Sequence, residues 1–493
     1  MRLAVIAVVL VCARVAAAQP DSQGSGAADP SPTPSPSPSP SPSPSPTPSP
    51  SPSPTPSPTP APSVEPGSIQ APSTTNTLTH DSAATTGGVA VGDFKFAFHG
   101  YARMPLSTQG TREPYLVDND YYLSGFAYTR LYESDWSELR FSATKGDYTA
   151  EFAIFSTLYS DYAQADLTDQ LGVTQASVTG HDFLGVKGLS AQVGVFWDRY
   201  GYIEPYDTYI FGRTHQGGAK LAYDLPAGGR VQAGIGMHEA ELQQNEGTTP
   251  IVHVAGTVPI PTPAGPVDLG AYYLRTWTHD KPPTSTIEDG SMYVTGLDAT
   301  YKLPDRRGTA YLAFGYYHMD QALNLAPALE VLNSTGGRGI AENFLGTTAS
   351  DNGSGRMYTL AADVKLRITD LAGLRLFGIG TWVRSPEIDL ENPLTNYDRR
   401  LYFKWGAEPS YWVTPKIRVS ARYDRVILDV YNSANSFHVL SPKIAFPFDN
   451  WGELFVQYSH YWYGDQVQLR AGQVPLETEP DRDVVKVQAQ VTW

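Results

Sequence analysis

The chain of 493 residues carries 35 lysines and arginines against 50 aspartates and glutamates, a formal net charge of −15. This balance excludes nucleic acid as a partner held by general electrostatic attraction. The single cysteine, Cys12, lies in the N-terminal apolar run, so the rest of the chain has no thiol and no disulfide.

The first 18 residues have the pattern of an export signal. Arg2 precedes an apolar run from Leu3 to about Cys12, and Ala16 to Ala18 supply the small residues of a cleavage site. Beyond this signal, no apolar run approaches the ~20 residues that a membrane-spanning helix needs. Any membrane-spanning segments of this chain must therefore be strands.

Residues 19–88 are rich in serine, proline and threonine, and from about Pro30 to Pro62 the chain is nearly pure Ser-Pro and Thr-Pro. Proline fixes φ and removes a hydrogen-bond donor, so this segment cannot join a sheet or a helix. We expect a disordered or polyproline II extension in the periplasm, rising about 3.1 Å per residue where it is extended. Composition favours a spacer, with contact to the cell wall as the alternative.

From residue 89 onward, alternation with a period of two predicts strands. In FKFAFHGYARMPL (94–106), Phe94, Phe96 and Phe98 form one face, and Lys95 and His99 belong to the other. The same alternation recurs at 230–238, 359–368, 416–423 and 485–493. Between such segments lie turns rich in Gly, Asn, Asp and Pro, such as DLPAGGR, KLPDRRG and TASDNGSGR.

Three features favour a transmembrane antiparallel β-barrel over a soluble sandwich. Tyrosine and tryptophan cluster near strand ends (YYLSGFAY, GAYYLRTW, VQYSHYWYG), as interfacial girdles require. Some connections are long, such as Met319 to Met357, whereas others are tight turns. The chain ends on an alternating strand, DVVKVQAQVTW. Residues 89–493 suit 18 strands, with 16 as the alternative, and a barrel of this size encloses an aqueous channel.

Elimination of the other functions of such barrels favours a passive pore. The sequence has no paired-histidine metal motif, no nucleophile elbow and no glycine-rich phosphate loop, so we expect no enzyme, no catalytic residue, no metal and no cofactor. Residues 19–88 lack the core of a transporter plug. A secretion barrel is also disfavoured, because the proline-rich tract would be its only passenger.

The aromatic stretch VFWDRYGYIEPYDTYIFGRTHQGG, Val195 to Gly218, leaves two interpretations open. It is a loop folded into the pore as a constriction, where aromatic rings meet sugar faces and charged groups bond their hydroxyls. Alternatively, it is an external loop whose Tyr and Trp side chains lie at the membrane interface.

Five segments, in collinear order over most of residues 94–493, resemble the maltoporin family of carbohydrate-specific porins. They are FHGYAR (98–103), WSELRF (136–141) with the preceding Arg130, QASV (175–178), FWDRYGYIEPYDTY (196–209) and FKWGAEPSYWVTPKIRVSARYD (403–424). The resemblance implies an 18-stranded barrel, a homotrimer and an inward-folded third loop. It also implies an aromatic track flanked by polar residues.

Matching positions imply roles for eight residues. The implied aromatic-track residues are Tyr101 and Trp136, with Tyr209 narrowing the constriction; the implied polar-track residues are Arg103, Arg130, Glu138, Arg199 and Asp207. Strand parity agrees for Tyr101 with Arg103 and for Trp136 with Glu138, since each pair shares the polar face of its strand.

Some positions depart from the family pattern and thin the implied track. Thr492 replaces a penultimate aromatic residue, Thr174 replaces an arginine, and the first loop lacks its cysteine pair. Trp412 stands one position before the place expected for a late-barrel tryptophan, which Val413 occupies.

The sequence therefore predicts a porin of a Gram-negative outer membrane that passes maltodextrin or other oligosaccharides by facilitated diffusion. Its expected partners are these solutes, outer-membrane lipid and two further copies of the chain, but no nucleic acid. The alternatives are a porin for other small solutes, or a structural tether between the outer membrane and the cell wall.

Overall fold

The computed structural model describes residues 88–108, 129, 131, 135–156, 171–201, 203–206, 211–238, 250–263, 265–277, 291–320, 354–384, 399–427, 430, 436–448, 451–464, 470–471, 474–475 and 482–492. The predicted signal (1–18) and all but the last residue of the predicted extension (19–88) lie outside these residues. No helix in the described part of the chain is long and apolar enough to cross a membrane.

The described residues form an all-β structure. Its strands are β1 (Gly88–Val91), β2 (Phe94–Ser107), β3 (Trp136–Lys145), β4 (Tyr148–Ser156), β5 (Leu171–Gly180), β6 (Leu189–Arg199), β7 (Arg213–Asp224), β8 (Arg230–His238), β9 (Pro250–Ile260), β10 (Val267–Trp277), β11 (Ser291–Lys302), β12 (Gly308–Asp320), β13 (Ser354–Arg367), β14 (Ala372–Arg384), β15 (Arg399–Thr414), β16 (Ile417–Ile427), β17 (Ser436–Phe448), β18 (Gly452–Tyr463), β19 (Arg470–Ala471), β20 (Val474–Pro475) and β21 (Arg482–Thr492). Two short 3₁₀ turns, η2 (Phe183–Gly185) and η3 (Pro304–Arg306), lie in connections.

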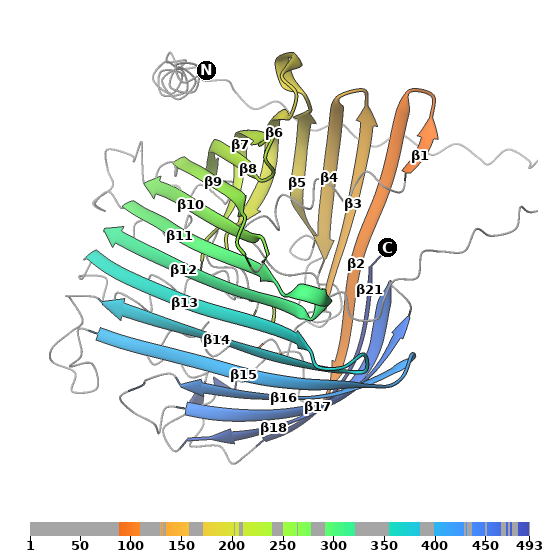
Figure 1. Ribbon diagram of the computed structural model, residues 1–493, viewed down its shortest axis with the longest axis vertical. Coiled ribbons are helices and arrows are strands. Elements are labelled where there is room, and N and C mark those ends of the chain that lie inside the picture. The colour runs from red at the N-terminus through yellow and green to blue at the C-terminus, as the bar shows by residue number, and fades with distance from the viewer. Residues whose placement is uncertain are drawn as a thin grey trace, which may run out of the picture. The chain divides into compact units, whose positions relative to one another are not determined.

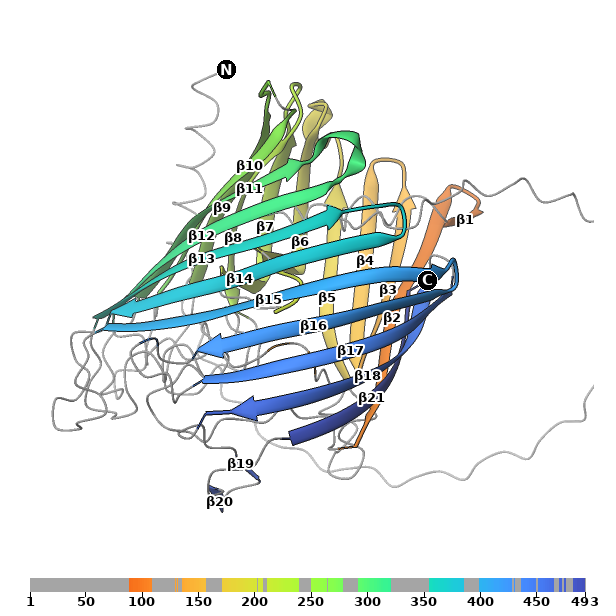
Figure 2. The same ribbon diagram turned by 60° about the horizontal axis from the view of Figure 1, so that its bottom comes forward.

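The strands β2–β18 and β21 form a closed antiparallel barrel of 18 strands, in which each strand pairs with its neighbours in sequence (Figures 1 and 2). The terminal strand β21 pairs with β18 on one side and with β2 on the other, from Tyr101↔Thr492 to Ser107↔Lys486. This pairing closes the sheet, so the barrel strands have no free edge. The predicted transmembrane barrel and its 18 strands are confirmed.

The short strand β1 lies on the same edge of β2 as β21. It pairs with residues 94–97 of β2, from Gly88↔Ala97 to Val91↔Phe94, whereas β21 pairs with residues 101–107. The two strands therefore follow one another along β2, with residues 98–100 of β2 between the stretches that they pair with.

The connections at the two ends of the barrel differ in length. At one end the strands are joined by short turns, such as residues 225–229 between β7 and β8 and 303–307 between β11 and β12. At the other end β12 stops at Asp320 and β13 begins at Ser354. The third predicted turn, TASDNGSGR, belongs to this long connection and runs into β13. Short turns at one end and long loops at the other are typical of outer-membrane barrels, whose turns are periplasmic.

The two faces of each strand differ as the alternation predicts. On β2, Phe94, Phe96 and Phe98 are all exposed on the outer face, with Phe96 46% exposed, whereas inward-facing Ala97 is 7% exposed. On β8, Val231, Ile235 and other outward residues are exposed, and inward Gln232 is buried. A row of apolar side chains that points away from the interior is the lipid-facing surface of a membrane barrel.

A charge on this outer face should weaken the barrel. For Phe98→Lys we expect the free energy of unfolding to fall by about 2–4 kcal/mol, since the ammonium group would enter lipid. The measurement is urea unfolding of the protein reconstituted in lipid, followed by the gel mobility of the folded form. The control is His99→Gln on the opposite face, expected to change stability by less than about 1 kcal/mol. Equal losses in both variants would contradict this assignment of the faces.

Candidate functional site: the lumen and its infolded segment

The connection between β6 and β7 lies inside the barrel. Of its described residues, Tyr200, Ile203, Tyr206 and Phe211 have no exposed surface. They belong to one buried cluster with inward side chains of the strands opposite, including Tyr272, Tyr317, Phe377 and Tyr402. The segment therefore packs against the inner wall, which confirms the inward-folded loop and rules out the external-loop alternative for the described residues.

Glycine allows the chain to turn as it leaves β6. Gly201 has φ +59, a left-handed conformation, and a Cβ atom there would lie 2.6 Å from Cβ of Phe211. A side chain at this position would be strained and would collide with the returning strand of the segment.

Ion pairs hold the middle of the segment against the wall. The Glu204 carboxylate accepts a 2.9 Å hydrogen bond from Lys365 Nζ and forms an ion pair with Arg375 Nη2, also at 2.9 Å. Arg375 is in turn held by Asp363, whose Oδ1 lies 2.9 Å from its Nε. Asp363, Lys365 and Arg375 come from the adjacent strands β13 and β14, so the barrel wall presents a preformed pair of cations to one loop carboxylate.

A second anchor comes from β16. Arg422 pairs with Asp424 at 2.8 Å, and its Nη2 donates 3.1 Å to the backbone carbonyl of Pro205 and 2.7 Å to that of Thr129. Thr129 belongs to the connection between β2 and β3 and is buried. One arginine therefore fixes backbone from two long connections inside the barrel.

Aromatic contacts complete the second anchor. Lys404 Nζ lies 4.4 Å from the Tyr206 ring centroid, and this ring meets Phe377 edge-on at 5.2 Å. A cation over a ring face gains most where water is excluded, as around these two buried side chains.

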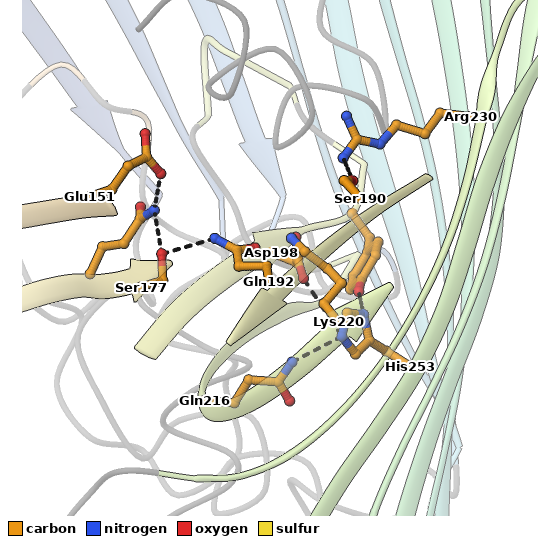
Figure 3. A network of polar contacts seen from close by, with 11 residues as sticks. Glu151, Ser177, Ser190, Gln192, Asp198, Gln216, Lys220, Arg230 and His253 are labelled. Atoms are coloured by element: carbon orange, nitrogen blue, oxygen red, sulfur yellow. Dashed lines mark hydrogen bonds and ion pairs between the residues drawn. The ribbon is translucent and has the colours of Figure 1, made fainter. Parts of the chain in front are cut away.

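A fully buried polar network lies at the root of the segment (Figure 3). Asp198 Oδ1 accepts a 2.9 Å hydrogen bond from Lys220 Nζ, and its Oδ2 lies 3.6 Å from His253 Nε2. His253 also contacts Gln216 Nε2 at 2.9 Å and the Tyr200 hydroxyl at 2.5 Å. These contacts join the end of β6 to β7 and β9. Removal of either Asp198 or Lys220 would leave the other as a buried charge without this partner.

The wall formed by β2–β5 stays in part accessible and carries the predicted residues. The ladder places Arg103 opposite Trp136 and Tyr101 opposite Glu138, so all four share the inner face. Glu138 accepts a 3.1 Å bond from Arg140 Nη2. Trp136, Glu138 and Tyr101 are half-buried, whereas Arg103 is 9% exposed.

Phe155, which the sequence analysis did not single out, completes this surface. Its ring stacks on Trp136 with centroids 4.8 Å apart and planes 11° apart. The ladder places Gly172 of β5 opposite it, and a Cβ at Gly172 would lie 1.9 Å from the Phe155 ring. Thr174 is an extra residue in β5, and this bulge turns Gly172 inward. The alternation of Thr149, Glu151 and Ala153 would have placed Phe155 on the inner face.

The wall of β15–β18 and β21 is also charged. Arg418 Nη2 lies 2.7 Å from Glu453 Oε2, and Gln490 donates 3.1 Å to the same carboxylate. Trp412 lies on this inner face, 5.6 Å from the Arg418 guanidinium, whereas Val413 is 54% exposed on the outer face. The offset of Trp412 therefore does not remove a late-barrel tryptophan from the lumen.

Of the four other predicted residues, the structure describes only Arg199, which lies away from the β2–β5 wall. Arg199 ends β6, where it lies opposite Arg213 at the root of the infolded segment. Arg130, Asp207 and Tyr209 lie outside the described residues. The described residues hold no group of three His, Asp or Glu side chains suited to a metal ion.

No protein-family model and no curated protein sequence matches the chain. Among solved structures, it is similar to OmpT of Vibrio cholerae, with 11% identity, a TM-score of 0.35 and coverage of 83% of this chain and 100% of that one. It is also similar to Wzi of Escherichia coli, an outer-membrane, carbohydrate-binding β-barrel involved in capsule assembly (10%, TM-score 0.41, 80% and 84%). A third is OccD3 of Pseudomonas aeruginosa (11%, TM-score 0.41, 83% and 93%). This similarity is too low to transfer an activity or a substrate to the chain.

The ion pairs of Glu204 predict an effect on ion selectivity. Glu204→Gln removes one negative charge from the cluster that Glu204 forms with Lys365 and Arg375. A unit charge about 7 Å from an ion in water contributes about 0.6 kcal/mol, with opposite sign for anions and cations, so we expect the anion-to-cation permeability ratio to rise by up to about sevenfold. The measurement is the reversal potential of planar bilayers under a salt gradient.

The matched control is Asp305→Asn, which removes an exposed charge from the turn between β11 and β12. It should leave the permeability ratio unchanged. A Glu204→Gln channel that is indistinguishable from it would show that Glu204 does not face the ion path.

Proposed function

We propose that this protein is an outer-membrane porin of a Gram-negative bacterium, through which sugars such as maltodextrins or other oligosaccharides diffuse passively. One observation carries the proposal: the stacked pair Trp136–Phe155 lies beside the Glu138–Arg140 ion pair on an accessible wall of the lumen. Flat aromatic rings fit the apolar faces of a pyranose, and the adjacent charged groups can bond its hydroxyls.

The infolded segment supports the proposal that solutes pass along one side of the lumen. It covers the inner face of β9–β15 with buried side chains, while accessible polar groups remain on β2–β5 and, at Arg418 and Glu453, on β16 and β18. A solute is thereby directed along the surface that carries Tyr101, Trp136 and Glu138. Contacts made to one side of a water-filled path are favourable but weak, as conduction requires.

The test is block of single-channel current by millimolar maltodextrins, sucrose and other oligosaccharides. We expect at least one of them to reduce the conductance, and Trp136→Ala to weaken that block by about threefold to tenfold, for stacking of about 0.5–1.5 kcal/mol. The control is Trp382→Ala on the outer face, where the ring is 49% exposed. It should leave the block unchanged.

Two outcomes would overturn this proposal. If every sugar leaves the conductance unchanged, the protein is a porin for other small solutes. If Trp136→Ala prevents assembly of the barrel, the ring has a structural role instead. The homotrimer that the maltoporin resemblance implies stays a prediction, and native mass spectrometry of the detergent-extracted protein checks it.

For residues 19–88 we propose a periplasmic spacer, because their Ser-Pro and Thr-Pro composition supports an extended chain without a core. Deletion of residues 20–88 should leave channel conductance and sugar block unchanged. Envelope integrity, measured as resistance to detergent, should also stay unchanged for a spacer. A loss of integrity with unchanged solute flux would favour the cell-wall tether.

A further inference from the structure

The outer face of β10–β13 changes its chemistry along the strands. From the short-turn end, the ladder aligns three rows made of Ala, Val, Leu and Phe with one Tyr. The fourth row is Tyr273, Thr295, Tyr316 and Tyr358. The fifth row, nearest the long loops, is Arg275, Tyr293, His318 and Arg356.

The fifth row lies at the border of the lipid-facing band. From Val267 to Arg275 the strand advances about 27 Å at 3.4 Å per residue, or about 21 Å along the membrane normal at a tilt of about 40°. The outward apolar band of such a barrel is about 25 Å tall. The tyrosines of the fourth row therefore occupy the level of an aromatic girdle, and the arginines lie just beyond it.

The tyrosines form a connected girdle at this level. Ring centroids lie 6.2 Å apart for Tyr273 and Tyr293, 5.9 Å for Tyr293 and Tyr316, and 4.9 Å for Tyr316 and Tyr358. Trp382 of β14 continues the series at 6.2 Å from Tyr358. A continuous aromatic strip of this kind marks the interface between acyl chains and headgroups.

The two arginines carry charge that the described residues do not neutralise. Arg275 and Arg356 are exposed, and among the described side chains neither has a carboxylate partner. The Arg275 guanidinium lies 5.6 Å from the Trp277 ring centroid, which is its described contact. In a chain of net charge −15, two such cations at one membrane border indicate an anionic partner there.

The spacing of the arginines limits what that partner is. Their backbone positions lie three strand intervals apart, about 14 Å at about 4.8 Å per interval. Guanidinium groups bind phosphate through two parallel hydrogen bonds. A headgroup with phosphates at both ends of a disaccharide would span this distance, while Tyr293 and His318 lie between the two arginines.

We propose that the row Arg275, Tyr293, His318 and Arg356 binds the phosphorylated headgroup of a glycolipid in the outer leaflet, with one phosphate at each arginine. The position of the row selects a lipid over a soluble anion, because the acyl chains can lie along the apolar rows beneath it. The proposal does not depend on which solute the pore passes.

The test uses the full chain in detergent micelles, titrated with a bis-phosphorylated, acylated glucosamine disaccharide and followed by native mass spectrometry. The double variant Arg275→Gln/Arg356→Gln should bind this glycolipid at least about tenfold more weakly, since it loses charge-assisted bonds to both phosphates. The matched control is Arg307→Gln, which removes an exposed arginine from a short turn at the other end. It should bind as the unmodified chain does.

Further measurements distinguish binding from misfolding and from other partners. Arg275→Lys/Arg356→Lys keeps the charge and should retain most of the affinity, which a folding defect would not. Unchanged affinity in the glutamine variant, or equal affinity for a phosphate-free glycolipid, would overturn the proposal. So would displacement of the glycolipid by inorganic phosphate at similar concentration, which indicates a soluble-anion site, or a changed oligomeric state with unchanged binding, which indicates an interface between copies.

Discussion

Backbone N–H and C=O groups that face hydrocarbon have no water to bond, so a sheet in a membrane must satisfy all of them through its own strands. In this protein that requirement is met by the pairing of β21 with β2, which joins residues nearly 400 positions apart and closes the barrel. Residues 94–97 of the same edge of β2 pair with β1. The outward apolar rows and the inward polar rows are both consequences of this closed ladder.

A closed barrel of 18 strands is too wide for its wall side chains to fill. The segment between β6 and β7 occupies part of that space, and its aromatic residues form the only extended apolar cluster described within the wall. Its backbone is held by Arg422, and its carboxylate Glu204 by Lys365 and Arg375. Because these partners belong to strands of the barrel, the segment is fixed against the inner face of β9–β15.

The two faces of each barrel strand meet different surroundings, the lumen on one side and lipid on the other. On β2 and β3, the inward positions carry Tyr101, Trp136 and Glu138, while outward Phe98 and Phe141 contact each other with centroids 4.9 Å apart. On β10–β13 the inner face is instead buried under the infolded segment. There the outer face carries polar residues, which are the tyrosines of the girdle and the two arginines. The proposed solute path and the proposed lipid site therefore lie on different sectors of one wall.

Local alternation predicted the strands and the faces of the residues singled out on them, because a strand repeats every two residues whatever its partner. The prediction of a barrel also needed the aromatic strand ends, the unequal connections and the terminal strand. Parity alone placed Phe96 on the outer face and Tyr101 and Trp136 on the inner face, and it predicted the terminal strand. Contacts between distant strands did not follow. The position of Gly172 opposite the Phe155 ring depends on the bulge at Thr174, and the bond of Lys365 to Glu204 joins residues 161 positions apart. The alignment of Arg275 with Arg356 needs the register of four strands. Register is set by which strands meet and how far they slide, and only the closed tertiary ladder decides that.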